Sequence, residues 1–211
     1  MSLQLGSIAP NFEAVTTAGK INFHTWLDDT WCVLFSHPKD FTPVCTTELG
    51  ETSKLKEQFE DINTKVIALS VDNVNDHIQW IKDIDETQQT CVNFPIIDDS
   101  SFHISKLYGM IHPESSDSTT VRSVFIIDPM KKIRLTMTYP ASTGRNFKEI
   151  IRALKSLQLT DKYKLATPVN WIEGERSIVI PSVSNQDAML LFNGEVEIIK
   201  PYLRYVETPK C

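Results

Sequence analysis

Hydrophobic residues in the first part of the chain form short continuous runs that alternate with segments of helical periodicity. The runs at 31–36 and 65–71 are largely apolar, which is typical of strands buried on both faces of a sheet. Further strands are predicted at 95–97, 123–127 and 133–138. The pattern therefore predicts an α/β protein.

Apolar residues between these strands recur at the spacing of one helix face. The residues predicted to face the core are Leu55, Phe59 and Ile62 on a helix that begins at Pro43, Val74, Ile78 and Ile81 on the next helix, and Phe147, Ile150, Ile151 and Leu154 on a later one. The last two strands are joined by a turn at 128–131 and followed by the last of these helices. This order predicts a thioredoxin-like fold.

The last part of the chain has a different character. Prolines and glycines interrupt it, and only one short helix at 184–192 and extended pieces at 177–180 and 202–206 are predicted. We expect such a tail to be unable to bury a core of its own. The chain is therefore divided into a thioredoxin-like domain, residues 1–160, and a C-terminal extension or arm, residues 161–211.

The charge balance and the first residues narrow the range of partners. The formal net charge of -6 and the pI near 5.4 argue against a nucleic-acid surface. The start of the chain lacks a basic leader, and no stretch approaches the roughly 20 apolar residues that span a bilayer. We expect a cytoplasmic protein with no nucleic-acid partner and no membrane insertion.

The chain contains the cysteines Cys32, Cys45, Cys91 and Cys211. They show no C-x-x-C spacing, so neither a zinc site nor a disulfide framework is predicted, and no metal or organic cofactor is expected. Cys32 lies in a predicted buried strand and is interpreted as a small core residue. Cys91 has no activating neighbour and is interpreted as structural or incidental.

Cys45 differs from the others because it falls in the first turn of a predicted helix. Thr42 followed by Pro43 is typical of an N-cap and a first helical residue, with the hydroxyl accepting a free backbone N–H. Unpaired N–H groups and the positive end of the helix dipole favour an anion there. The pattern predicts a thiolate nucleophile.

The surroundings of Cys45 resemble a known family. The run Pro38-x-x-x-Thr42-x-x-Cys45 is similar to the active-site signature of peroxiredoxins, and longer stretches resemble the one-cysteine subgroup, the peroxiredoxin 6 type. These stretches are 35–49, 139–147, 157–160 and 166–171. The resemblance covers nearly the whole chain.

The resemblance implies a thiol-dependent peroxidase of the antioxidant defence. Such an enzyme reduces hydrogen peroxide and alkyl hydroperoxides through a Cys45 sulfenic acid, which an external thiol, glutathione or a thioredoxin-like protein, then restores. It also implies an arm that reaches over a partner subunit, and so a homodimer or a higher oligomer. The alternative from another class is a peroxide sensor or holdase chaperone.

The reaction requires a thiolate, hydrogen-bond donors for both peroxide oxygens and a dry pocket. Cys45 is the predicted nucleophile. Thr42 can direct its hydroxyl toward the thiolate or the peroxide, or serve only as the N-cap. Pro38 offers an apolar wall that carries no N–H group.

A cation near the sulfur is also required, because a helix end supplies only about 0.3 to 1 kcal/mol. Arg122 opens an apolar strand, and the resemblance assigns it to the thiolate and the peroxide. Arg145 and Glu48 are expected to orient it, or else to form a solvated salt bridge. His37 could tune or contact the sulfur, or simply be packed. The remaining histidines show no ligand spacing and are assigned no metal: His24, His77, His103 and His112.

Two further activities of related proteins are not assigned. Phospholipid hydrolysis in some members needs a serine and an aspartate where this chain has Thr30 and Met130, although His24 matches. Two-cysteine relatives carry a Val-Cys-Pro motif that does not occur here. The terminal Cys211 is left open as a group that could reach the sulfenate.

Overall fold

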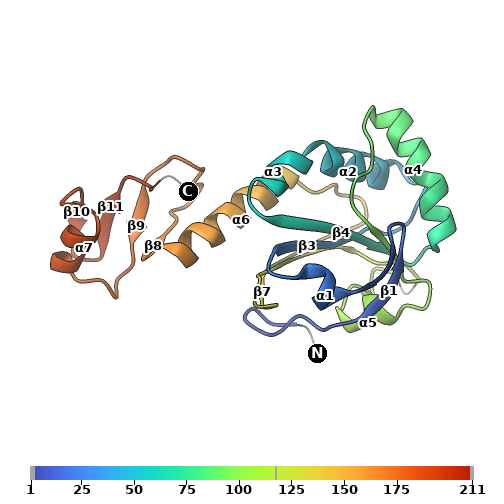
Figure 1. The fold of residues 1–211 in the computed structure, drawn as a ribbon, viewed down its shortest axis with the longest axis horizontal. Helices are drawn as coiled ribbons and strands as arrows, with labels where there is room; N and C mark the ends of the chain where they lie inside the picture. Colours follow the sequence, from blue (N-terminus) through green and yellow to red (C-terminus); the bar gives the residue numbers. More distant parts are fainter. Residues whose placement is uncertain (1–2, 117, 210–211) are drawn as a thin grey trace. The chain divides into compact units, whose positions relative to one another are not determined.

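The computed structural model describes residues 3–116 and 118–209, and the chain forms two compact units, residues 1–147 and 148–211 (Figure 1). The boundary between the units lies at the first residue of helix α6 (Phe147–Lys162). The boundary predicted after position 160 therefore falls in the last turn of this helix. Sequence periodicity alone does not mark the change of unit, because the helix runs through it.

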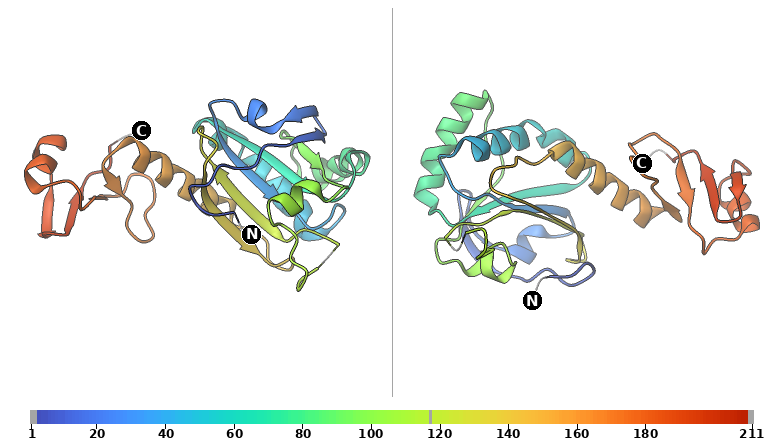
Figure 2. Two further views of the ribbon diagram at one scale, coloured as in Figure 1. Left: turned by 90° about the horizontal axis from the view of Figure 1, so that it is seen from below. Right: turned by 180° about the vertical axis from the view of Figure 1, so that it is seen from behind.

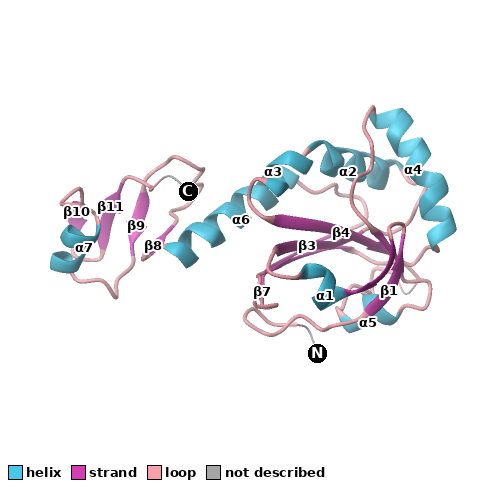
Figure 3. Cartoon of the chain, in the orientation of Figure 1, coloured by secondary structure: helices cyan, strands magenta, loops and turns pink. Residues whose placement is uncertain are grey.

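The first unit is built on one sheet (Figure 3). It has seven strands in the order β2-β1-β5-β4-β3-β6-β7. The strands are β1 (Glu13–Thr16), β2 (Gly19–Asn22), β3 (Trp31–Ser36), β4 (Thr64–Ser70), β5 (Ile96–Asp98), β6 (Arg122–Ile127) and β7 (Ile133–Tyr139). Strands β3, β4 and β5 run parallel, while β6 pairs antiparallel with both β3 and β7. The carboxyl ends of the three parallel strands therefore meet at one edge of the sheet.

Helices cover both faces of this sheet. The helices of the first unit are α1 (Phe23–Leu27), α2 (Pro43–Lys54), α3 (Lys56–Glu60), α4 (Val74–Gln88) and α5 (His103–Leu107). Figures 1 and 2 show α2 and α4 on one face and α1 and α5 on the other. The side chain of Asn73 caps α4 by accepting from the backbone N–H groups of Asn75 and Asp76, which explains why that helix begins there.

The strands predicted for this unit are confirmed to within one residue at each end, but two helical details are wrong. The helix that begins at Pro43 is interrupted at Leu55, which lies between α2 and α3. The buried face of α4 consists of His77, Trp80 and Ile84 instead of the predicted Val74, Ile78 and Ile81. A histidine and a tryptophan form most of this face, so a pattern that counts only aliphatic residues finds the wrong side of the helix.

The second unit contains a small antiparallel sheet with the order β10-β11-β9-β8. Its elements after α6 are β8 (Leu165–Ala166), β9 (Ser177–Val179), α7 (Asn185–Leu191), β10 (Glu197–Lys200) and β11 (Leu203–Val206). The expectation that this segment cannot bury a core is wrong, since it holds a cluster of buried residues: Leu165, Val179, Val183, Ala188 and Val206.

A buried arginine explains how so short a segment closes on itself. Arg204 is 2 % exposed and donates to the backbone carbonyls of Ile180 and Val183 and to the side chain of Asn185. These bonds tie β11 to the loop before α7.

Among the described residues, no helix is long and apolar enough to cross a bilayer.

Candidate active site

Cys45 lies where the sequence predicts it, in the first turn of α2. That helix begins at Pro43, soon after β3 ends at Ser36. The side chain of Cys45 is fully buried. Its position near the helix start places it next to backbone N–H groups that have no partner within the helix, and these favour an anion.

Thr42 occupies the N-cap position, but the prediction that its hydroxyl caps the helix is wrong. Its side chain makes no capping hydrogen bond; instead its hydroxyl donates to the carbonyl of Lys39 at 2.7 Å. The carbonyl of Thr42 accepts from the hydroxyl of Thr46 at 2.9 Å. Since the single hydroxyl proton of Thr42 is engaged, its oxygen can meet a substrate only as an acceptor.

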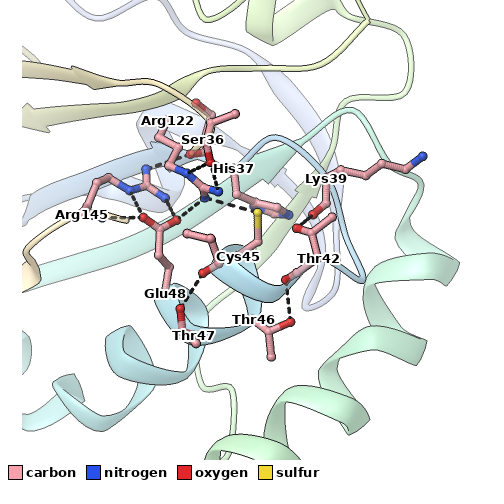
Figure 4. A network of polar contacts seen from close by, with 12 residues as sticks. Ser36, His37, Lys39, Thr42, Cys45, Thr46, Thr47, Glu48, Arg122 and Arg145 are labelled. Atoms are coloured by element: carbon pink, nitrogen blue, oxygen red, sulfur yellow. Dashed lines mark hydrogen bonds and ion pairs between the residues drawn. The ribbon is translucent and has the colours of Figure 1, made fainter. Parts of the chain in front are cut away.

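Arg122 supplies the cation that the helix end alone does not (Figure 4). Its Nη1 lies 3.3 Å from the Cys45 sulfur and 2.7 Å from Oε2 of Glu48. Its Nε and Nη2 donate to the carbonyl of Ala141 at 3.0 and 2.6 Å. The guanidinium is therefore held on two sides, and one of its nitrogens faces the sulfur.

Glu48 and Arg145 are buried and tightly paired, so the alternative of a solvated salt bridge is wrong. Glu48 Oε1 accepts from the backbone N and from Nε of Arg145 at 2.8 and 2.9 Å, and Oε2 accepts from Nη2 at 2.6 Å. Arg145 Nη1 also donates to the carbonyls of Ser36 and Ser123. These bonds orient the carboxylate that in turn holds Arg122.

The guanidinium cluster, which we define as Arg122, Glu48 and Arg145, has an unbalanced charge. It contains two cations and one carboxylate, all buried. Burial would raise the pKa of Glu48, but the hydrogen bonds and charge of Arg145, with the charge of Arg122, lower it below its usual range. Because a buried uncompensated cation is costly, the cluster favours a thiolate at Cys45 as its second anion.

His37 and Pro38 line the same region. Both are buried, and in Figure 4 the Cys45 sulfur points toward the side chains of Arg122 and His37. The His37 ring also packs against Trp80, with ring centroids 5.1 Å apart, and Trp80 Nε1 donates to the hydroxyl of Thr46. These contacts connect α4 to the first turn of α2.

A second polar cluster adjoins His37 and was not predicted. Asp40 Oδ1 lies 2.8 Å from Nε2 of His37, and Asp40 Oδ2 lies 2.6 Å from Nδ1 of His77. We call His37, Asp40 and His77 the imidazole cluster. All three are buried. A signal for this cluster in the sequence is His77, a histidine on the buried face of α4.

The titration of this cluster follows from burial and from the shared carboxylate. Burial lowers the pKa of His37, and Asp40 only partly opposes this. Burial would raise the pKa of Asp40, but hydrogen bonds from the two histidines lower it to about 2. Burial would lower the pKa of His77, but Asp40 and the carbonyl of Ile97 raise it. The carboxylate is therefore ionised at neutral pH.

The imidazole cluster has the residue types of a metal site. Among the described residues, this is the group whose possible ligand atoms lie close enough together to hold a metal ion, all within 4.8 Å of one another. However, these atoms already face each other across short hydrogen bonds, so each carboxylate oxygen of Asp40 is engaged with one histidine. The donor set fits a hydrogen-bonded array better than a metal centre.

The other candidate residues lie apart from this chemistry. Cys32 is fully buried in β3, and burial raises the pKa of its thiol against the opposing charge of Lys65. Cys91 is exposed, and Cys211 lies outside the described residues. His24 Nε2 contacts the carbonyl of Ala9 and the Thr30 hydroxyl donates to the carbonyl of Leu27. Within the described residues, no contact joins His24 and Thr30 into a pair of the kind that a hydrolase needs.

Comparison with known families gives two matches. Residues 5–136 match the AhpC/TSA family, and residues 156–191 match the C-terminal domain of 1-Cys peroxiredoxin. A 1-Cys peroxiredoxin of Dictyostelium discoideum is 52% identical over 207 residues, which cover 98% of this chain and 86% of the relative. Human Peroxiredoxin-6 is 48% identical, with 98% of both chains covered.

Solved structures give the same result. A mutant of the peroxiredoxin 6 of Arenicola marina is similar with a TM-score of 0.95 and 46% identity, and the alignment covers 100% of both chains. A yeast mitochondrial 1-Cys peroxiredoxin, solved to explain thiol resolving via glutathione and thioredoxin systems, is similar with a TM-score of 0.92 and 50% identity. That alignment covers 97% of this chain and 99% of the yeast chain.

Proposed function

Because the chain belongs to the AhpC/TSA family and is a one-cysteine peroxiredoxin, a thiol-dependent peroxidase, we propose that Cys45 is its peroxidatic cysteine. The observation that carries this proposal is the 3.3 Å contact between Arg122 Nη1 and the Cys45 sulfur inside a cluster that lacks one negative charge. A thiolate at this position satisfies the cluster and is the reactive form of the thiol.

The proposed reaction is a displacement at oxygen. The Cys45 thiolate attacks the terminal oxygen of the hydroperoxide, and the O–O bond breaks. Cys45 becomes a sulfenic acid, and the other oxygen leaves as an alkoxide or hydroxide that takes up a proton. Arg122 can follow this charge because its Nη1 already faces the sulfur, so it stabilises the developing anion as well as the thiolate.

Thr42 and Pro38 complete the pocket in this proposal. The Thr42 oxygen, whose proton is donated to Lys39, accepts the hydrogen bond of the hydroperoxide O–H and so aligns the terminal oxygen with the sulfur. Pro38 is buried and has no N–H group to compete for the peroxide. Thr42→Val should therefore slow the attack, and Thr42→Ser should restore most of it.

An external thiol closes the proposed cycle. The yeast relative was studied for thiol resolving via glutathione and thioredoxin systems, and we extend the same class of reductant, glutathione or a thioredoxin-like protein, to this chain. The thiol attacks the sulfenic sulfur and displaces water, and a second thiol releases Cys45. The alternative, resolution by Cys211, predicts a Cys45 to Cys211 disulfide after one equivalent of peroxide.

We also propose that the enzyme is a homodimer or a higher oligomer. The second unit exposes large apolar side chains that a partner surface can cover. They include Val169, Ile172, Leu190, Leu191 and Tyr202. The double variant Leu190→Glu and Tyr202→Glu should weaken association in sedimentation experiments. Met130→Glu, at an equally exposed site in the first unit, is the matched control.

A cytoplasmic location remains part of the proposal. The acidic composition is compatible with it, whereas one relative, Peroxiredoxin PRX1 of Saccharomyces cerevisiae, is named mitochondrial. Fractionation of cells that express the full chain tests the location.

The decisive experiment replaces the cysteines one at a time. Cys45→Ser should abolish peroxide reduction with a small-thiol reductant, whereas Cys91→Ser should retain it because Cys91 is exposed and lies outside the cluster. Intact mass after one equivalent of peroxide should show one added oxygen on Cys45. Comparable turnover in Cys45→Ser would refute the assignment.

A further inference from the structure

His77 is held between two oxygen acceptors. Its Nδ1 lies 2.6 Å from Oδ2 of Asp40 and its Nε2 lies 3.1 Å from the carbonyl of Ile97. Only an imidazolium, with a proton on each nitrogen, donates to both. The negative charges of Asp72 and Asp98 favour a proton on His77. His37 is the neighbouring basic group, and a positive charge on it would disfavour that proton. The raised pKa of His77 agrees with this geometry.

Asp40 is held in place through its backbone N–H group. Oδ2 of Asp72 accepts from the backbone N–H of Asp40 at 3.0 Å and from the hydroxyl of Ser70 at 2.9 Å. The residue is therefore fixed at the edge of the sheet where β4 ends. A fixed anion between two imidazoles dictates which nitrogens carry protons.

The ionised carboxylate of Asp40 determines which ring nitrogen of His37 carries the proton. Ionised Asp40 can only accept, so the 2.8 Å contact requires the proton of His37 on Nε2. The other nitrogen, Nδ1, then carries a lone pair. It is buried and has no hydrogen-bond partner within the described part of the chain. A buried polar atom without a partner is unusual and points to a group that binds during the reaction.

We infer that Asp40 and His77 are positioning residues that fix His37 as the tautomer whose Nδ1 accepts the hydroxyl proton of the Cys45 sulfenic acid. This inference rests on the proposed function, because it requires a sulfenic acid on Cys45. Neither Asp40 nor His77 touches the reacting atoms; both act through the ring of His37.

The chemical consequence concerns the second oxidation of Cys45. The hydrogen bond to Nδ1 increases the electron density on the sulfenic acid, which makes its sulfur a better nucleophile. The sulfur attacks the terminal oxygen of a second hydroperoxide, the O–O bond breaks, and the sulfenic proton passes through Nδ1 to the leaving oxygen. The products are a sulfinic acid and an alcohol or water. The imidazole cluster thereby sets how fast the enzyme is inactivated when reductant is short.

Asp40→Asn is the most direct test. An amide can accept a hydrogen bond from only one histidine and must donate to the other, so the tautomer of His37 is no longer fixed. The second oxidation should slow about tenfold, the rate equivalent of one buried hydrogen bond, while the first changes by less than about threefold. The measurement is a quenched time course of intact mass, in which one oxygen and then a second are added.

Two further variants sharpen the test. His77→Gln keeps a donor toward Asp40 but removes the positive charge, so it should slow the second oxidation by a smaller factor. His37→Gln combined with Asp40→Asn should be no slower than His37→Gln alone, because both changes remove the same acceptor. His103→Gln, at an exposed histidine on α5, should behave like the unchanged protein.

A spectroscopic measurement keeps the inference testable if Asp40→Asn does not fold. Long-range proton–nitrogen spectra of the unchanged protein should show His77 with both nitrogens protonated and His37 protonated on Nε2 alone. A neutral His77, or a proton on Nδ1 of His37, would overturn the inference. So would a second oxidation in folded Asp40→Asn that keeps its original rate or slows only in parallel with the first.

The outcomes also separate this inference from the proposed function. If the proposed function is wrong, the unchanged protein gains no oxygen on Cys45. If only the inference is wrong, the unchanged protein gains first one oxygen and then a second, and Asp40→Asn does so at the same rates.

Discussion

Two buried polar clusters lie near Cys45, and they differ in their balance of positive and negative groups. The guanidinium cluster contains two cations and one carboxylate, so it favours a further anion, and in the proposed function the Cys45 thiolate is that anion. The imidazole cluster contains one carboxylate between a cationic and a neutral imidazole, so its charges are already balanced. The first can therefore stabilise charge during the reaction, whereas the second can only direct protons. We therefore expect the guanidinium cluster to govern the first oxidation of Cys45 and the imidazole cluster to govern the second.

The largest effect is expected for Arg122→Met, which removes the cation that faces the sulfur. Loss of one donor to a developing oxyanion typically costs about 100- to 1,000-fold in rate. The first oxidation should fall by at least the lower value, as measured by stopped-flow at several pH values to separate the thiolate fraction from the attack itself. Arg122→Lys should restore part of the rate, since lysine makes a single-point contact.

Arg176→Met is the control for this prediction, because Arg176 is half-exposed and belongs to the second unit. Equal attack rates for the unchanged protein and Arg122→Met, compared at the same thiolate fraction, would remove Arg122 from the catalytic residues and erase the distinction between the clusters.

The next largest effect is expected on stability, from Glu48→Gln. This change leaves two buried guanidinium groups without a carboxylate, and breaking a buried ion pair costs about 3 to 5 kcal/mol. The free energy of unfolding from urea titration should fall by this amount. Asp40→Asn should cost less, because its partners are imidazoles and one of them can become neutral. The reverse order of the two losses would contradict the proposed charge balance.

Both clusters should lower the stability of the protein as the pH falls below neutrality, and only the imidazole cluster should lower it as the pH rises above neutrality. The pKa of Asp40 is lowered from 3.8 to about 2, so its contribution is present above the ordinary value and is lost as the pH falls from about 4 to 2, with a size on the order of 2 kcal/mol. Glu48 should add a loss in the same direction, since its pKa is also lowered.

On the alkaline side, stability should instead fall as the pH rises, because the pKa of His77 is raised above 6.5. Its contribution is complete below pH 6.5 and is lost as the pH rises through the raised value. Thermal unfolding between pH 6 and 9 should show this loss in the unchanged protein but not in His77→Gln. The same loss in both proteins would assign it to another group.

The smallest effect is expected for Trp80→Phe. This variant keeps an aromatic ring against His37 but removes the hydrogen bond to Thr46, which is worth about 0.5 to 1.5 kcal/mol. The second oxidation should change by less than about tenfold and the first should stay unchanged, because Trp80 has no contact with the guanidinium cluster among its described interactions. A larger effect on the first step would mean that the hydrogen bond from Trp80 to Thr46 also positions Cys45 for the first oxidation.

The sequence predicts one of the two clusters much better than the other. Apolar runs locate the strands, and Thr42-Pro43 locates the start of α2 and so the turn that holds Cys45. The family resemblance then assigns Arg122, Arg145 and Glu48 to the site, and the structure brings all three together. What it does not predict is the hydroxyl of Thr42, which donates to Lys39 instead of capping the helix. Local signals give a position but not a hydrogen-bond partner.

The sequence alone determined the central strands and the start of α2, and it singled out Cys45 as the candidate nucleophile, because periodicity and helix-start residues act over a few neighbouring positions. Only the tertiary structure decided the imidazole cluster and the core of the second unit. Asp40 follows β3, His77 belongs to α4 and Ile97 to β5, and parallel pairing of β3, β4 and β5 brings these distant segments to one edge. Contacts across such separations depend on strand order and register, which no local pattern encodes.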